Sequence, residues 1–145
     1  MNKTLSPGEE LALNLKVASS LFTDVFEKSI SSFGITGSQY NVLRILRGVY
    51  PEGHARCEIF KRMIDKSPDI TRLIDRLEKQ GLVERIRTTE DRRMSISKIT
   101  EKGLELVNKL QPVINEANKL ITENLTDNEC KQLSEKIEKT YEKLI

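Results

Sequence analysis

Apolar residues recur at steps of three and four along most of the chain, which predicts a mainly helical protein. The first stripe follows a capping box formed by Ser6 and Glu9, with Pro7 at the first helical position, and it predicts a helix that ends near Ile30. The apolar positions of this helix are Leu11, Leu15, Ala18, Phe22, Val25 and Phe26. They lie on one face, so the helix is amphipathic.

A second capping box, formed by Thr36 and Gln39, predicts a short helix. Its buried face is supplied by Val42, Leu43 and Leu46. A loop with two glycines and a proline follows, and a third helix is expected over residues 55–64. The inward positions of that helix are Ile59, Met63 and Ile64.

A fourth helix is expected to begin almost immediately after the third. Ser67 is a natural N-cap, Pro68 is a natural first residue, and Gly81 suits the left-handed position that ends many helices. The apolar face between these ends consists of Ile70, Leu73, Ile74 and Leu77. Two short helices joined by so tight a turn are typical of a helix-turn-helix.

After Gly81 the apolar spacing changes from 3.6 to two, which is the spacing of a β-strand. Residues 82–86 and 94–99 alternate in this way, and the polar residues 88–93 lie between them. The pattern predicts a β-hairpin directly after the helix-turn-helix, which is the position of a wing.

Two more amphipathic helices are expected at the C-terminal end. Thr100 and Gly103 open a long helix, in which Pro112 predicts a bend. The apolar seam of this helix, which suits a partner helix, consists of Leu106, Leu110, Val113, Ala117 and Leu120. A third capping box, Thr126 with Glu129, starts the last helix. Its stripe consists of Cys130, Leu133, Ile137, Tyr141 and Leu144.

These elements predict one folding unit over residues 1–145, mostly α with a small β-hairpin wing. Residues 35–100 form a winged helix-turn-helix, and residues 6–32 and 101–145 form terminal helices. Because the winged part can bury its own core, the terminal stripes need another surface. We expect a homodimer, and the alternative is a terminal three-helix bundle within one chain. The residues expected at the dimer interface are Leu11, Leu15, Leu133, Ile137, Tyr141 and Leu144.

Charge adds a modest indication of a nucleic-acid partner. The net charge is only +2, but residues 56–98 carry 12 Lys and Arg against 8 Asp and Glu, while the rest of the chain carries 12 against 14. No secretory signal or long apolar run is apparent, so a cytoplasmic location without membrane contact is expected.

Catalytic, cofactor and metal chemistry are not expected. The chain has no Cys-x-x-Cys pair and no glycine-rich phosphate loop. Its single histidine, His54, lies in the glycine and proline loop without companion ligands, so no metal site is predicted. Cys57 and Cys130 are expected to be reduced, and Cys57 is interpreted as a small buried apolar residue rather than a redox sensor.

Four segments, in the right order and spacing, resemble the MarR family of winged helix-turn-helix repressors. They are residues 35–43, residues 67–83 from Ser67-Pro68-Asp69 to Gly81-Leu82-Val83, Asp91-Arg92-Arg93 in the hairpin tip, and Ile99-Thr100-Glu101-Lys102-Gly103. The resemblance implies a triangular homodimer built by the terminal helices. It also implies release from DNA when a small phenolic ligand binds or a cysteine is oxidised. Oxidant sensors of the family usually carry the reactive cysteine in the first helix, where this chain has none.

Base reading requires short polar side chains at the front of a helix that lies in the major groove. The candidates for base edges or adjacent phosphates are Ser67, Pro68, Asp69, Thr71 and Arg72. The candidates for phosphate alone are Arg62, Lys66 and Arg76, and backbone donors are expected at Thr36, Gly37 and Ser38. Several of these residues also have structural uses, because Ser67 and Asp69 can cap a helix and Arg72 can pair with Asp69 or Asp75.

The predicted wing offers a minor-groove contact. Arg93 is the candidate for insertion, Asp91 for its orienting carboxylate, and Arg92 or Arg87 for phosphate. A solvated charged turn is the alternative for these residues. The sequence thus favours a sequence-specific regulator, expected to be a repressor, that binds double-stranded DNA and a small-molecule effector. A winged-helix adaptor that binds protein instead of DNA is the alternative function.

Overall fold

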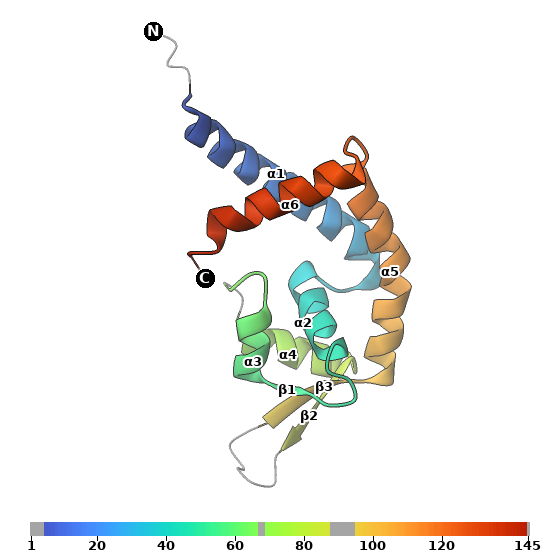
Figure 1. Ribbon diagram of the computed structural model, residues 1–145. Coiled ribbons are helices and arrows are strands. Elements are labelled where there is room, and N and C mark those ends of the chain that lie inside the picture. The colour runs from blue at the N-terminus through green and yellow to red at the C-terminus, as the bar shows by residue number, and fades with distance from the viewer. Residues whose placement is uncertain (1–4, 67–68, 88–94, 145) are drawn as a thin grey trace.

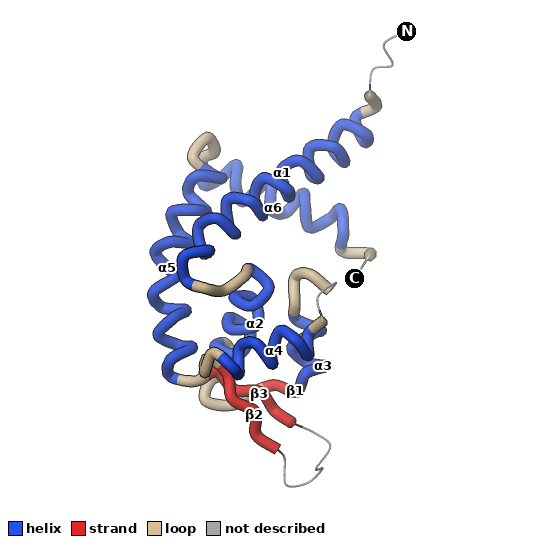
Figure 2. Tube along the Cα trace, turned by 180° about the vertical axis from the view of Figure 1, so that it is seen from behind, coloured by secondary structure: helices blue, strands red, loops and turns tan. Residues whose placement is uncertain are grey.

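The computed structural model describes residues 5–66, 69–87 and 95–144. Figure 1 shows α2, α3, α4 and the short strands gathered at one end of the molecule, with α1 and α6 at the other end and α5 running between the two. Figure 2 shows the same arrangement from behind, with the small sheet beneath α4. The mainly helical winged architecture confirms the fold class predicted from the sequence.

The three predicted capping boxes all form, and each starts the helix expected of it. α1 (Pro7–Ile30) follows Ser6, α2 (Gly37–Arg47) follows Thr36, and α6 (Asp127–Tyr141) follows Thr126. In each box the cap side chain accepts a hydrogen bond from the backbone three residues later, and that later side chain accepts one from the cap backbone. A short 3-10 turn, η1 (Ser31–Phe33), ends the first helix.

The sheet has one strand more than the sequence predicted. β2 (Val83–Arg87) and β3 (Ser95–Ile99) form the expected antiparallel hairpin, with Val83 opposite Ile99. β1 (His54–Ala55) pairs with the other edge of β3, and the strand order is β1-β3-β2. His54, which the sequence placed in a loop, therefore lies in a strand. Two residues are too few for any alternation of polar and apolar positions to show.

The helix-turn-helix differs from the prediction at its turn. α3 (Arg56–Arg62) ends two residues early, and α4 (Ile70–Lys79) begins later than expected. Met63 is buried as predicted, but Ile64 is 86% exposed because the backbone at Met63 is extended instead of helical. Ile64 also donates its backbone N–H to the Asn41 side chain at 2.9 Å, which ties the turn to α2. Cys57, expected to be buried, is exposed.

The apolar faces of α2, α4 and α5 meet in one core beside the sheet. Its fully enclosed side chains include Leu43 and Leu46 from α2, Leu77 from α4, and Val107 and Leu110 from α5. The first half of α5 is thus part of the same core as the helix-turn-helix.

α5 (Glu101–Thr122) is a continuous helix with Pro112 inside it, and it is bowed in Figure 1. Its buried stripe consists of Gly103, Val107, Leu110, Ile114 and Ala117. In the apolar seam predicted from the sequence, Leu110 and Ala117 are buried, whereas Leu106 and Val113 are half-buried and Leu120 is exposed. The buried stripe is offset by about one residue from that seam, at Val107 and Ile114, because this face of the helix packs on its own chain.

A close contact joins the end of α4 to the start of α5. Gly81 has a φ of 72°, and the Leu82 and Gly81 N–H groups donate to the Leu77 and Glu78 carbonyls at 2.9 Å each, which is a Schellman motif. The Thr100 N–H donates to the Leu82 carbonyl at 3.1 Å, and the Thr100 hydroxyl donates to the Gly81 carbonyl at 2.8 Å. These bonds hold α5 against the turn that ends α4.

Gly103 makes this contact sterically feasible. A Cβ at this position would overlap the Leu82 carbonyl oxygen and the Ile99 side chain. The Gly103 N–H also donates to the Thr100 hydroxyl oxygen at 3.1 Å, so the Thr-x-x-Gly spacing caps α5 while it permits the approach.

Both terminal helices expose apolar side chains. Among the residues predicted at a dimer interface, Leu11, Leu133, Tyr141 and Leu144 are exposed, and Leu15 and Ile137 are half-buried. No residue of α6 is buried. A helix that crosses a bilayer needs a long apolar run, and none of the described helices has one.

Gly103→Ala is expected to destabilise the protein by about 1–3 kcal/mol, because the added methyl group must displace backbone at Leu82. Gly8→Ala is the matched control, since a Cβ there meets no atom within 4 Å. Urea unfolding of the two variants measures the difference. Equal stability of both variants would show that the α5 contact tolerates a side chain.

Candidate nucleic-acid interface

The second helix of the helix-turn-helix begins with an aspartate cap. The Asp69 carboxylate accepts hydrogen bonds from the Thr71 and Arg72 N–H groups at 3.0 and 3.3 Å. Asp69, not Ser67, is therefore the N-cap, and the first helical residue is Ile70 instead of Pro68. The positions of Ser67 and Pro68 themselves lie outside the described residues. A carboxylate that accepts from two backbone donors is an effective cap.

α4 has two contrasting faces. Leu73, Ile74 and Leu77 are buried in the core, while Arg72 and Arg76 are exposed on the rest of its surface. The Arg72 side chain is 80% exposed and lies 3.3 Å from the Asp69 carboxylate, which confirms one of the two pairings considered from the sequence. Arg76 forms no ion pair with another described residue.

α4 is also tied to the hairpin by charge. The Arg85 guanidinium on β2 hydrogen-bonds the Asp75 carboxylate and lies 3.6 Å from the Glu78 carboxylate. Asp75 therefore pairs with Arg85, whereas Arg72 pairs with Asp69. The two ion pairs, together with the buried apolar face, hold the exposed face of α4 in a defined orientation relative to the strands.

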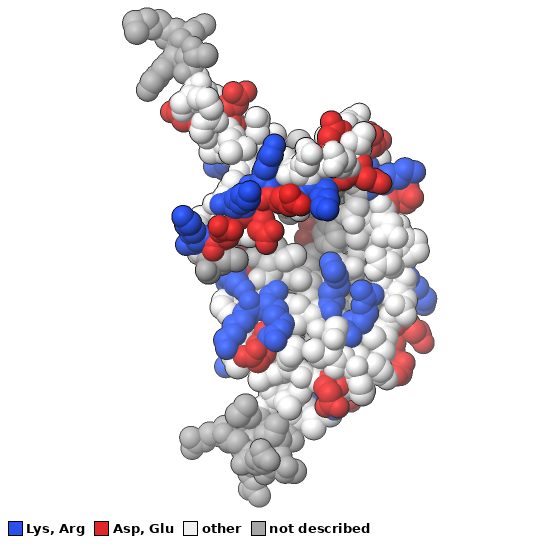
Figure 3. Space-filling model, viewed as in Figure 1, with Lys and Arg blue, Asp and Glu red and all other residues white. Residues whose placement is uncertain are grey.

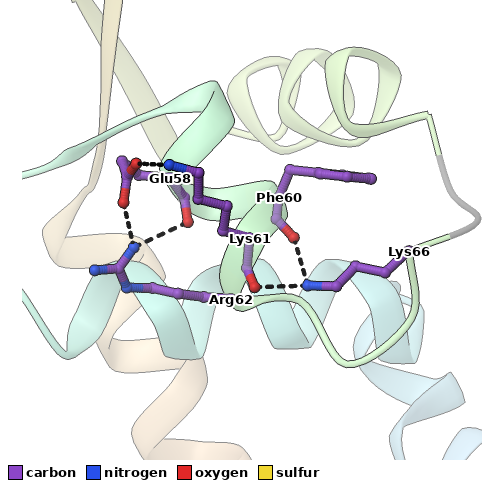
Figure 4. Close-up of polar contacts among 5 residues, drawn as sticks. All are labelled: Glu58, Phe60, Lys61, Arg62 and Lys66. Carbon is purple, nitrogen blue, oxygen red and sulfur yellow. Dashed lines mark hydrogen bonds and ion pairs between the residues drawn. The ribbon is translucent and has the colours of Figure 1, made fainter. Parts of the chain in front are cut away.

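A charge network covers the outer surface of α3 (Figure 4). The Glu58 carboxylate accepts hydrogen bonds from the Lys61 ammonium at 2.9 Å and from the Arg62 guanidinium at 2.7 Å. These two bonds lower the pKa of Glu58 from its ordinary value of 4.5 to about 2. Arg62, predicted to contact phosphate, is therefore exposed but already oriented by a carboxylate.

Lys66 has a structural role that the sequence did not indicate. Its ammonium donates to the Phe60 and Lys61 carbonyls at 2.9 and 2.6 Å, so it caps the C-terminal end of α3 (Figure 4). It also lies 5.7 Å from the centre of the Phe60 ring. A lysine at a helix C-terminus is stabilised by the helix dipole as well as by these bonds.

The backbone donors predicted at the start of α2 are mostly engaged within the protein. The Thr36 N–H donates to the Gln39 side chain at 3.0 Å, and the Gly37 N–H donates to the Glu27 carboxylate at 2.9 Å. The prediction that both would offer free N–H groups was wrong. Ser38, the third predicted donor, is half-buried in the first turn. The capping box occupies the Thr36 N–H group, and the contact with Glu27 of α1 occupies the Gly37 N–H group.

The structure describes little of the wing tip. Arg87 is the last residue of β2. Asp91, Arg92 and Arg93 lie outside the described residues.

One polar contact within the helix-turn-helix was missed by the sequence analysis. The guanidinium of Arg56, the first residue of α3, donates to the Thr71 hydroxyl at 3.0 Å. The sequence indicated no partner for Arg56. The two residues are 15 positions apart and on different helices, so no local pattern could have linked them.

Basic side chains gather on the face shown in Figure 3. They lie over α2 and α3, while α6 above them carries both signs of charge. The last turn of α2 carries Arg44, which is exposed, and Arg47, which is half-buried. The cationic surface thus extends from the helix-turn-helix to its neighbouring helix.

Comparison with known proteins identifies the family. Residues 35–95 match the model of the MarR family. The chain is 35% identical to the MarR transcription factor from Planctomyces limnophilus, with a TM-score of 0.74, over 94% of this chain and 98% of the other. This chain belongs to the MarR family. It is therefore a transcription regulator of the MarR type, as the resemblance of its motifs predicted.

More distant MarR-type structures share the fold. A mutant of MarR from E. coli in complex with operator DNA has a TM-score of 0.80 and 24% identity, over 90% of this chain and 93% of the other. BpsR from Bordetella bronchiseptica, whose DNA binding is regulated by 6-hydroxynicotinic acid, has a TM-score of 0.80 and 22% identity, over 91% of this chain and 98% of the other.

The pKa of Glu58 tests the charge network on α3. Its folded pKa lies below the ordinary value, so the ion pairs favour the fold above about pH 4.5 and lose that effect as the pH falls through about 2. In an NMR titration of the carboxyl group, Lys61→Met is expected to raise the pKa of Glu58 toward 4.5. Lys66→Met, which leaves both bonds in place, is expected to leave it unchanged. A wild-type pKa of 4.5 would contradict the network.

Proposed function

We propose that this MarR-type regulator binds double-stranded operator DNA as a cytoplasmic homodimer and acts as a repressor, with α4 in the major groove. The observation that carries the proposal is the exposed face of α4, which presents Arg72 and Arg76 opposite a face buried in the core. A helix held in this way can enter a groove without losing its own packing. The E. coli structure with operator DNA supports the same use of the fold.

The front of α4 would read bases. In this proposal Thr71 and Arg72 face base edges, with Ser67, Pro68 and Asp69 beside them. Arg72 is well suited because a guanidinium can donate two parallel bonds to guanine, and its exposed ion pair with Asp69 is weak enough to exchange. Asp69 would stay in place as the helix cap.

Longer cations behind the front of α4 would bind phosphates. The proposed phosphate contacts are Arg62, Lys66, Arg76 and Arg87, with Ser38 at the start of α2. Arg76 is the simplest of them because its side chain is exposed. Arg62 keeps further N–H donors after it bonds Glu58, and Lys66 would have to exchange a carbonyl for a phosphate oxygen.

The wing would reach the adjacent minor groove. Arg93 is the proposed inserted residue, Asp91 would hold its guanidinium, and Arg92 would contact phosphate. The hairpin that carries these residues is anchored to α4 through Arg85.

Arg76→Gln is expected to weaken binding to all DNA sequences and to lower the slope of log K against log salt by about 0.9, because one phosphate contact is lost. Arg93→Ala is expected to cost about 1–3 kcal/mol of operator binding with an unchanged melting temperature. Titration of genomic operator fragments at several salt concentrations measures both effects, with Lys131→Gln on α6 as the control. A wild-type protein that binds no DNA but captures a protein partner would support the adaptor function instead.

The homodimer would be built by α1 and α6. α1 exposes Leu11, Leu13, Val17, Leu21 and Phe22, and α6 and its end expose Leu133, Tyr141 and Leu144. Large exposed apolar side chains gathered on two helices are typical of a protein interface. A second copy would cover both helices, with Leu15 and Ile137 at their half-buried edges, and would set two α4 helices about 34–36 Å apart for successive major grooves.

The double variant Leu133→Glu and Ile137→Glu is expected to be monomeric and to lose operator affinity, because charges would enter the proposed interface. Helix content should be retained, since α6 buries no residue within its own chain. Gln132→Glu, an exposed position on the same helix, is the control for added charge. Light scattering during size-exclusion chromatography gives the mass. A monomeric wild-type protein would refute the dimer.

A small phenolic effector would release the protein from DNA. The cleft best placed for it has a volume of about 570 Å³ and lies between η1, the end of α4 and α5. Its apolar residues are Phe33, Ile35, Leu82 and Leu106, and its cations are Lys79, Lys102 and Lys109. Lys102 donates to the Gln80 carbonyl at 2.7 Å, so an anion that recruits Lys102 would disturb the end of α4.

A further inference from the structure

Arg56 links the two helices of the helix-turn-helix at the point proposed to read bases. Its Nη1 atom lies 3.0 Å from the Thr71 hydroxyl oxygen. Arg56 is exposed and Thr71 is half-buried near the start of α4, so the contact lies at the front of that helix. The Thr71 backbone N–H is already engaged by the Asp69 carboxylate, which leaves the hydroxyl as the polar group of Thr71 that can be turned.

The chemistry of the pair fixes which partner donates. A guanidinium has five N–H donors and no acceptor, whereas a hydroxyl has one proton and two lone pairs. The Thr71 oxygen must therefore accept from Arg56, and Arg56 cannot receive the hydroxyl proton. That proton remains available to a third group.

We propose that Arg56 is a positioning residue for operator specificity, which holds the Thr71 hydroxyl as a hydrogen-bond donor toward a base edge. This inference rests on the proposed function, in which α4 lies in the major groove. A donor there favours the major-groove acceptors, which are the N7 atoms of purines, guanine O6 and thymine O4. It disfavours cytosine, whose major-groove group is an amine that also donates.

Two other roles for Arg56 predict different measurements. A phosphate contact would weaken binding to every sequence alike and lower the salt slope by about 0.9. A strut between α3 and α4 would lower the melting temperature without changing base preference. Only the positioning role predicts that the base preference is lost at one base pair. The base preferences at the other positions of the site would stay as they are in the wild type.

The experiment begins with selection of binding sites from a randomised duplex library by the full-length wild-type protein. The selected site is then titrated with a panel of single base-pair changes against wild type, Arg56→Gln, Thr71→Val and the double variant. At one base pair, wild type is expected to prefer an acceptor base over cytosine by about tenfold. Each single variant should lose that preference, and the double variant should lose no more than either single one.

Two further variants guard the interpretation. Arg56→Lys replaces the guanidinium with an ammonium group, which also donates and cannot accept, and it should retain part of the base preference. Lys61→Gln removes a cation from the same helix but not from Thr71, and it should leave the preference intact. Melting temperatures of all variants report whether the helix-turn-helix remains folded.

The outcomes separate this inference from the proposed function. If wild type selects a site and Arg56→Gln keeps the full base preference, the inference is wrong, whether affinity falls uniformly or the melting temperature drops. If wild type selects no sequence at all, the proposed function fails and the inference fails with it. Loss of the preference in Arg56→Gln with its retention in Lys61→Gln supports the positioning role.

Discussion

The contact between the start of α5 and the turn after α4 is the constraint on which the rest of the structure depends. Thr100 bonds the carbonyls of Gly81 and Leu82, and Gly103 allows the two backbones to approach. From that point Val107 and Leu110 enter the core shared with α2 and α4. A single helix therefore continues from the core behind α4 to the terminal helices.

Several exposed cations of the helix-turn-helix are paired with a neighbouring carboxylate. Glu58 holds Lys61 and Arg62, and Asp69 caps α4 while it lies beside Arg72. A cation that is already hydrogen-bonded has lost part of its rotamer freedom, so less entropy remains to be lost when it meets a phosphate. The neighbouring carboxylate at the same time weakens the general attraction to DNA. This arrangement favours contacts of defined geometry over nonspecific electrostatic binding.

Burial is unequal along the chain. The winged part encloses most of its apolar residues, whereas α6 encloses none and the first half of α1 exposes most of its own. Because apolar area in water is costly at roughly 25 cal/mol per Å², a helix with this composition is stable chiefly when something covers it. The homodimer that we propose uses this surface, and the recognition helices would then be spaced by the same helices that carry it.

The sequence by itself determined the features whose interactions are local. The capping boxes at Ser6, Thr36 and Thr126 could be predicted because both partners lie within three residues. Gly81 could be predicted because a left-handed residue tolerates almost no side chain. The strands of the hairpin could be predicted from the alternation of apolar and polar residues. The motifs of the family could be recognised because each lies within a short segment of the chain. The exposed arginines of α4 could likewise be assigned to the face opposite its apolar stripe.

Only the tertiary structure decided where distant segments meet. Ile64 is exposed, and the buried stripe of α5 includes Val107 and Ile114, because each depends on contacts with another element. β1 exists only through its pairing with β3, and Arg56 reaches Thr71 only because α3 lies against α4. Local propensity depends on residues within about one turn of helix. These contacts join residues that are distant in sequence, and they form only when several segments pack into a common core.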